Sequence, residues 1–393
     1  MIELSLELRL IAACVRPLAD ERRLDAIRDA ASVRFDAEQV VTLAHRHRVE
    51  GFVKQGLAAA GVELPASAAR RLATSAAAAR LKTLRSAGEE VRVGQAFAAA
   101  GIDAIFIKGA TLGMRVHGTT ALKTSWDVDV LVSRDQQEAA GAVLRDLGYR
   151  LWILGGIEDP VKVRRFLAAH KEAEWRHEGR ETVAELHTEL ADNTAAIPTI
   201  GLGSPRETVD LTSGGSLATL ATAPLFAYLC YHGSSHLWAR LKWLADVAAL
   251  LRDENIARLH DEAVALGAGR TPGVAILLAH ELLGLDAPAP LLYSLRGDRV
   301  IRRLRRYSIA AIIAEQDERG RLARPFRELL AYARAQAWLV PGTAHRRSSI
   351  QRFLMRPYLP HHLAVPRWAV PGVILGGLPI RLLMRPLRLH RES

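Results

Sequence analysis

The chain contains 393 residues, of which 49% are hydrophobic, and it carries a formal net charge of +11. This length is enough for two or three domains with hydrophobic cores. The only cysteines, Cys14 and Cys230, exclude a disulfide scaffold and a cysteine-based zinc site, and they favour a reducing compartment, expected to be the cytoplasm. The sequence contains no run of eighteen apolar residues, so a conventional membrane span is not expected. Its first residues do not show the pattern of a signal peptide.

Positive charge is concentrated at the C-terminal end. Residues 296–393 contain 20 arginines and 6 acidic residues, whereas the remainder is slightly acidic. This imbalance suggests an anionic partner, namely nucleic acid, a nucleotide or a membrane surface. The alternative is that the arginines only cover exposed helix faces. Residues 368–380 are apolar but too short to span a bilayer, so we expect them to pack on the protein or to lie at a membrane surface.

The first hundred residues are predicted to form helices. Residues 66–100 are rich in alanine and predict one long helix with a break at Gly88 or Gly94. This helix leads into an apolar stretch that begins at Ile102. We therefore expect it to pack against the sheet to which that stretch belongs.

Two short strands are predicted in the next segment, over residues 102–107 and 127–132. The first ends at Lys108 and Gly109. A glycine lets the backbone approach a ligand closely, and a lysine offers a mobile positive charge suited to phosphate. After the second strand, the Ser-x-x-Gln pattern of residues 133–136 is typical of a capping box and predicts the start of a helix.

Two carboxylates mark the start of the second strand. Residues two apart in a strand share a face, so Asp127 and Asp129 should lie side by side. Carboxylates this close stay ionised only if cations neutralise them. Mg²⁺ is the obvious cation, because it prefers hard oxygen ligands and is commonly held by carboxylates together with substrate phosphates.

Three further strands are predicted at residues 150–154, 170–177 and 182–189. In the last of these, alternation places Glu185 and His187 on one side. The simplest alternative is that these are ordinary solvated strand residues.

Helices are predicted again after a Thr-, Gly-, Ser- and Pro-rich stretch. His232 and His236 are four residues apart and can share a helical face, a spacing that also suits zinc. The glutamate of metalloprotease helices is missing, however. We expect both histidines to line a cleft facing the sheet and to contact nucleotide or acceptor, together with Trp238, Lys242 and Asp246. A buried structural histidine pair is the competing interpretation.

In their order along the chain, these motifs resemble a known family. The residues that carry the resemblance are Lys108, Gly109, Lys123, Asp127, Asp129, Glu185, His187, His232, His236, Trp238, Trp243 and Asp246. Over most of its length the chain resembles the bacterial uncharacterised nucleotidyltransferases of the polymerase-beta-like nucleotidyltransferase superfamily.

The resemblance implies an α/β (α+β) fold in which a small mixed sheet forms the nucleotidyltransferase core between helical regions. The expected segments are a helical N-terminal region (1–100), the core (101–190), a linker or loop (191–216), a helical domain (217–340) and a basic Pro/Arg-rich C-terminal segment (341–393).

The resemblance also implies a Mg²⁺-dependent enzyme, with up to two ions, that moves an NMP group from an NTP, expected to be ATP, to an acceptor. Asp127, Asp129 and Glu185 would hold the metal and serve catalysis, with His187 beside them contacting substrate. The residues expected to contact the nucleotide are Lys108, Gly109, Lys123, His187, His232 and His236.

The acceptor stays open between a small molecule, a peptide, a protein and tRNA. Two other functions also stay open. One is a non-catalytic nucleotide- or RNA-binding module, against which the paired carboxylates argue. The other is a peripheral membrane or scaffold protein that acts through its basic C-terminal segment.

Overall fold

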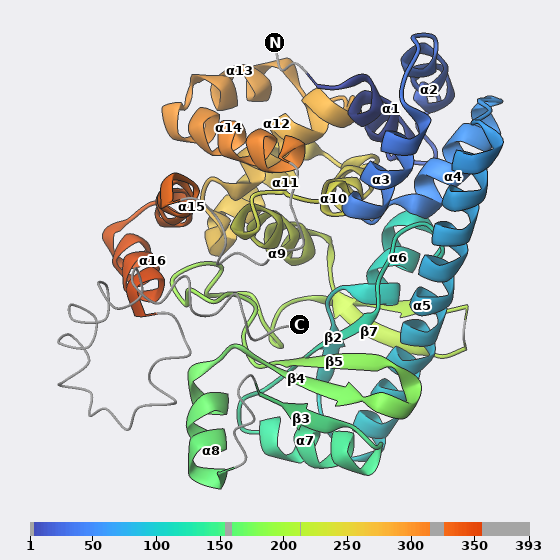
Figure 1. The fold of residues 1–393 in the computed structure, drawn as a ribbon. Coiled ribbons are helices and arrows are strands. Elements are labelled where there is room, and N and C mark those ends of the chain that lie inside the picture. The colour runs from blue at the N-terminus through green and yellow to red at the C-terminus, as the bar shows by residue number, and fades with distance from the viewer. Residues whose placement is uncertain (1–3, 154–158, 213, 315–325, 356–393) are drawn as a thin grey trace.

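The structure, a computed structural model, describes residues 4–153, 159–212, 214–314 and 326–355 (Figure 1). The apolar residues 368–380 and most of the arginine-rich C-terminal segment therefore lie outside the described residues. Within the described part, no helix combines the length and the apolar character needed to cross a membrane.

A five-stranded mixed sheet forms the lower half of the molecule in Figure 1. Its strands, in spatial order, are β1 (Ala104–Phe106), β2 (Asp127–Val132), β5 (Thr182–His187), β4 (Glu172–His177) and β3 (Arg150–Trp152). β2 and β5 run parallel, and every other neighbouring pair is antiparallel. The expected small mixed sheet is confirmed.

Helices precede the sheet, as predicted. They are α1 (Leu6–Cys14), α2 (Arg23–Ala31), α3 (Ala37–His47), α4 (Glu50–Ala60) and α5 (Ala66–Ala99). α5 runs along one side of the molecule, past both the helical region and the sheet (Figure 1). It is continuous, so the break expected at Gly88 or Gly94 does not occur.

The two faces of β2 pack against different layers. Val128, Val130 and Val132 are buried in a core that also contains Phe97 of α5 and Leu144 of α7 (Gln137–Asp146). The alternate residues Asp127, Asp129 and Leu131 lie on the opposite face, and Leu131 joins the larger core of the helical region. The β2 carboxylates thus face the C-terminal helices.

α7 begins later than its sequence suggests. Residues 133–136 form a turn in which the Gln136 N–H donates to the Ser133 carbonyl, 3.1 Å away. The Gln136 amide group instead ties Gly101 and Asp103 together. The capping-box prediction was therefore wrong in position, because this side chain serves the loop before β1.

The C-terminal helical region is built around α12 (Thr271–Leu283), whose residues 274–279 are all almost fully buried. Helices buried on all sides are apolar all round, as this one is. The surrounding helices are α9 (Thr222–Ser235), α10 (Leu241–Leu251), α11 (Ile256–Ala263) with a short π-helical extension (Val264–Ala268), α13 (Ala289–Gly297), α14 (Arg299–Ile313), α15 (Phe326–Trp338) and α16 (Thr343–Met355).

Several short elements connect these parts of the fold. A helical connection, α6 (Gly109–His117), links β1 to the segment before β2, and α8 (Pro160–Ala169) precedes β4. The stretch expected as a linker, 191–216, contains the strand β6 (Arg206–Asp210), which pairs with β7 (Ser216–Leu220).

Candidate active site

The parallel pairing of β2 with β5 brings three polar side chains together. In this register Asp129 lies opposite Glu185, and Leu131 lies opposite His187. His187 Nε2 is 3.2 Å from Asp129 Oδ1 and 3.5 Å from Glu185 Oε2. One ligand atom from each of the three residues lies within 4.8 Å of the other two, which is close enough to hold a metal ion. Asp129 and His187 are buried, whereas Glu185 is half-buried and reachable.

Lys108 adds a positive charge to this cluster. Its ammonium nitrogen lies 2.5 Å from Asp129 Oδ1. Burial alone would lower the pKa of Lys108, but the charge of Asp129 raises it well above its usual value. Burial would likewise raise the pKa of Asp129, yet Lys108 and His187 hold it well below its usual range. Both groups are therefore charged at neutral pH.

The pKa values of the remaining carboxylates of the cluster are shifted in opposite directions. Burial and the charge of Asp129 raise the pKa of Glu185. Burial opposes ionisation of Glu172 as well, but Lys171 and His187 lower its pKa to about 2. His187 lies between these groups, with Nδ1 3.2 Å from Glu172 Oε2. Burial would lower the pKa of His187, but Asp129 and Glu185 raise it, which favours the imidazolium form.

Asp127 lies at the edge of the cluster. It opens β2 and is half-buried, and its Oδ1 accepts a hydrogen bond from Ser125 Oγ at 3.2 Å. It shares a strand face with Asp129 but does not belong to the compact group of three ligands. Its charge nevertheless acts on the pKa of Lys108.

The backbone that follows Gly109 is held by Glu90, a residue that was not predicted from the sequence to belong to the site. The Glu90 carboxylate accepts hydrogen bonds from the backbone N–H groups of Ala110 at 2.7 Å and Thr111 at 3.0 Å, at the N-terminus of α6. A Cβ on Gly109 would lie 2.0 Å from Glu90 Oε1, and the φ of Gly109 is +65°. Glycine is thus required here by a protein carboxylate and by backbone geometry. A buried glutamate 20 residues before a helix start gives no recognisable sequence signal.

Lys123 lies in a separate buried cluster. Its ammonium is 2.7 Å from Asp246 Oδ2, and His117 Nε2 is 2.9 Å from Asp246 Oδ1. These contacts join the segment before β2 to α10. The structure therefore pairs Lys123 with Asp246 and not with the carboxylates of β2.

His232 and His236 lie side by side at the C-terminal end of α9. Their ring centroids are 4.8 Å apart, and both contact the ring of Trp243. Burial and the charge of Lys108 hold the pKa of His232 well below its usual range, so its imidazole is neutral beside the cluster. Within the described residues, no third metal ligand groups with these histidines. Trp238 is buried and donates to Ser234 Oγ at 3.1 Å, which indicates a packing role.

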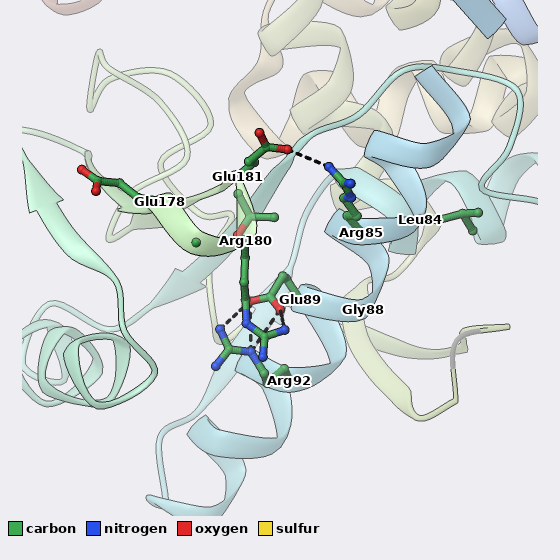
Figure 2. A pocket seen from close by; sticks show the side chains of 10 residues that line it. Leu84, Arg85, Gly88, Glu89, Arg92, Glu178, Arg180 and Glu181 are labelled. Atoms are coloured by element: carbon green, nitrogen blue, oxygen red, sulfur yellow. Dashed lines mark hydrogen bonds and ion pairs between the residues drawn. The ribbon is translucent and has the colours of Figure 1, made fainter. Parts of the chain in front are cut away.

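A groove of about 630 Å³ lies on the other face of the sheet, between α5 and the turn that joins β4 to β5 (Figure 2). Its arginines are already paired. Arg85 contacts Glu181 at 2.7 Å, and Arg92 and Arg180 both contact Glu89, at 2.5 and 3.0 Å (Figure 2). The groove therefore offers no unpaired charge that would favour phosphate.

Comparison with known proteins agrees with this geometry. Residues 34–284 match the family of uncharacterised nucleotidyltransferases, and the match spans α3 to α5, the carboxylate cluster, and His232 and His236. None of the curated proteins and none of the solved structures gives a significant match. Because the family match covers well over half of the sequence, the chain belongs to the uncharacterised nucleotidyltransferase family.

Proposed function

We propose that the protein transfers an NMP group from an NTP, expected to be ATP, to an acceptor in a Mg²⁺-dependent reaction. The observation that carries this proposal is the pairing of Asp129 with Glu185 across adjacent parallel strands, with His187 between them. Asp127, two residues earlier on the same face of β2, is the further carboxylate that would help to hold metal.

The donor set fits a divalent cation. Two carboxylates offer the hard oxygen ligands that Mg²⁺ prefers, while an imidazole is better suited to transition metals. We therefore assign the metal to Asp127, Asp129 and Glu185 and give His187 a supporting position. The bound metal would neutralise the triphosphate and lower the pKa of the attacking hydroxyl.

The protein's own residues would contribute positioning and electrostatics. Lys108 brings a buried positive charge next to Asp129, from where it can contact a phosphate oxygen. His187 keeps Asp129 ionised through its 3.2 Å contact. The ring of His232 packs edge-on against Trp243, and its pKa responds to the charges of Lys108 and Asp129. We therefore expect this pair of rings to limit the access of water to the cluster.

The test is incubation with α-phosphate-labelled ATP, Mg²⁺ and a cell extract. Wild-type protein should produce a labelled acceptor, and digestion of the product with RNase or protease should then separate tRNA, protein or peptide, and small-molecule acceptors. Asp129→Asn should reduce labelling by several orders of magnitude. Because it also breaks the buried ion pair with Lys108, its melting temperature should fall, and labelling is compared at a temperature where circular dichroism shows the variant to be folded. Full labelling by a folded Asp129→Asn variant would contradict the proposal.

One observation favours a second function, a nucleotide- or RNA-binding module without catalysis. The Lys108 ammonium already neutralises Asp129 at 2.5 Å, so the cluster is electrostatically satisfied by the protein itself. Nucleotide binding without any labelled product, over a range of extracts and divalent metals, would support this alternative. In either case we propose a cytoplasmic site of action, and we favour it over action at a membrane surface.

A further inference from the structure

Three basic side chains converge on Asp127, at the start of β2. They come from separate parts of the helical regions: Arg48 follows α3 as its C-cap, while Arg240 and Lys242 lie at the N-terminus of α10. The Leu241 N–H donates to His47 Nδ1 at 3.2 Å, which brings the start of α10 next to the end of α3. In keeping with this arrangement, the charge of Asp127 acts on the pKa of all three basic groups. All three side chains are half-buried, so they are anchored in the protein and still within reach of a ligand.

Contacts with the segment before β2 hold two of these cations in place. The Thr124 N–H donates to the Arg48 carbonyl at 3.3 Å, and the Lys242 ammonium donates to the Thr124 carbonyl at 3.2 Å. The Arg48 guanidinium also lies 3.6 Å from the centroid of the Trp126 ring. The positive charges are thus fixed before any ligand arrives, which is what tight binding of an anion requires.

The local charge is unbalanced. Among the described residues, Arg48, Arg240 and Lys242 form no ion pair within 4.0 Å. Two other acids are nearby, and both already have partners. Glu50 is bonded to His45 at 2.9 Å and to Thr124, and Asp246 is bonded to Lys123 at 2.7 Å and to His117. Burial lowers the pKa of Lys242 to about 7, and Arg48 acts in the same direction. A ligand with several negative charges would relieve this excess, in contrast to the fully paired arginines of the groove beside α5.

We propose that Arg48, Arg240 and Lys242 bind the terminal phosphates of the nucleoside triphosphate. This inference rests on the proposed function, because it places a polyphosphate with one end at the metal-binding carboxylates and the other among three cations. Arginine guanidinium groups suit bidentate contacts with phosphate, and a lysine adds a mobile charge. The site deepens the assignment made from sequence, which expected Lys108 and Lys123 to contact the nucleotide and Lys242 to contact nucleotide or acceptor, but gave no role to Arg48 or Arg240.

Titration calorimetry with inorganic pyrophosphate, in EDTA and with the full-length protein, tests this site without metal or turnover. Arg240→Gln and Lys242→Gln should each weaken pyrophosphate binding about tenfold or more. Lys54→Gln, which removes the same charge from an exposed position on α4, should change binding less than about twofold by comparison. Arg48→Gln is a third variant, and the other two carry the test if this one fails to fold.

The outcomes separate this inference from the proposed function. Asp129→Asn should abolish labelling yet still bind pyrophosphate without metal. If folded Arg240→Gln and Lys242→Gln variants bind pyrophosphate as well as the wild type and keep its KM for ATP, the inference is overturned even where labelling succeeds. If no labelling is found but these variants lose pyrophosphate binding, the anion site is supported and the transfer reaction is not. A wild-type protein that fails to bind pyrophosphate would also overturn the inference.

Discussion

The ammonium of Lys108 lies 2.5 Å from Oδ1 of Asp129, and the side chain of Asp129 is only 1% exposed. A lysine at the end of β1 therefore neutralises a buried carboxylate of β2. A metal ion bound at the same carboxylate would have to share it with Lys108 or displace it. Stability and metal binding are thus linked at this position.

Lys108→Met should destabilise the protein when metal is absent. The substitution leaves Asp129 buried with only His187 as a positive partner, and breaking a buried ion pair costs about 3–5 kcal/mol. Urea unfolding in EDTA measures this loss, and added Mg²⁺ should restore part of it by replacing the missing charge. Lys54→Met, at an exposed site, should stay within about 0.5 kcal/mol of wild type. A Lys108→Met protein as stable as the wild type in EDTA would show that the ion pair is not important.

Glu185→Gln should lower the rate of transfer at least about 100-fold, because it removes a metal ligand and a charge from the centre of the cluster. Glu174 provides a matched control. Glu174 is on β4, directly opposite Glu185 of the neighbouring strand β5. Its carboxylate is paired with Arg176 at 2.6 Å. Glu174→Gln should keep activity within a few fold of the wild type. Equal losses in the two variants would mean that general charge, and not a specific ligand, controls the rate.

Glu90 should make stability depend on pH. Burial raises its pKa to about 7 in the folded protein, from 4.5 for the free group. Below about pH 4.5 the carboxyl group is protonated in both states. Between that pH and 7 the unfolded chain releases its proton first, so the free energy of unfolding falls as pH rises. The total loss from this group is about 3 kcal/mol, and its contribution to the slope ends above pH 7, where both states are ionised.

The Glu90→Gln variant isolates this effect. Glutamine keeps only one carbonyl oxygen, so it can replace the acceptor of Ala110 or of Thr111 but not both, and the variant should be less stable at every pH. It has no proton to release, however. Denaturant unfolding at several pH values between 5 and 7 should therefore give a flatter dependence than in the wild type. Parallel curves for the two proteins would rule out Glu90 as the titrating group.

Substitution by alanine should have different effects on stability at two glycines of α5. A Cβ at Gly88 would meet nothing within 4 Å, whereas one at Gly94 would lie 2.5 Å from Leu217 Cδ2 on β7. Gly88→Ala should stabilise the protein by about 0.5–1 kcal/mol through helix propensity. Gly94→Ala gains the same propensity but must displace Leu217, so it should be less stable than Gly88→Ala. Thermal unfolding of the pair compares them directly, and equal gains would show that β7 yields freely.

The alternation of side chains along a strand was sufficient to predict that Glu185 and His187 share one face of their strand. It likewise predicted that Asp127 and Asp129 share one face of theirs. The structure brings Asp129, Glu185 and His187 together because β2 and β5 are parallel neighbours, which no local pattern specifies. Their catalytic roles remain predictions. Local patterns likewise predicted the individual strands of the sheet and most helices, since these depend on short-range periodicity.

Other features depend on contacts between distant segments and could not be predicted. The sequence does not indicate which acidic residue pairs with Lys123. Its partner is Asp246 because α10 packs against α6 in the folded protein. Arg48 and Arg240 are separated by almost two hundred residues and meet only through the folded helical regions. Gln136 looked like part of a helix cap, but tertiary hydrogen bonds to the loop before β1 take its side chain.

The parallel neighbours β2 and β5 are separated in sequence by α7, β3, α8 and β4. Pairings of such high sequence separation form slowly, because the intervening chain must be ordered before the contact is made. During synthesis, a nascent chain that ends before Thr182 already contains Asp127 and Asp129 but lacks β5, the strand with which β2 pairs. The carboxylate cluster can therefore assemble only after β5 has been synthesised and has paired with β2.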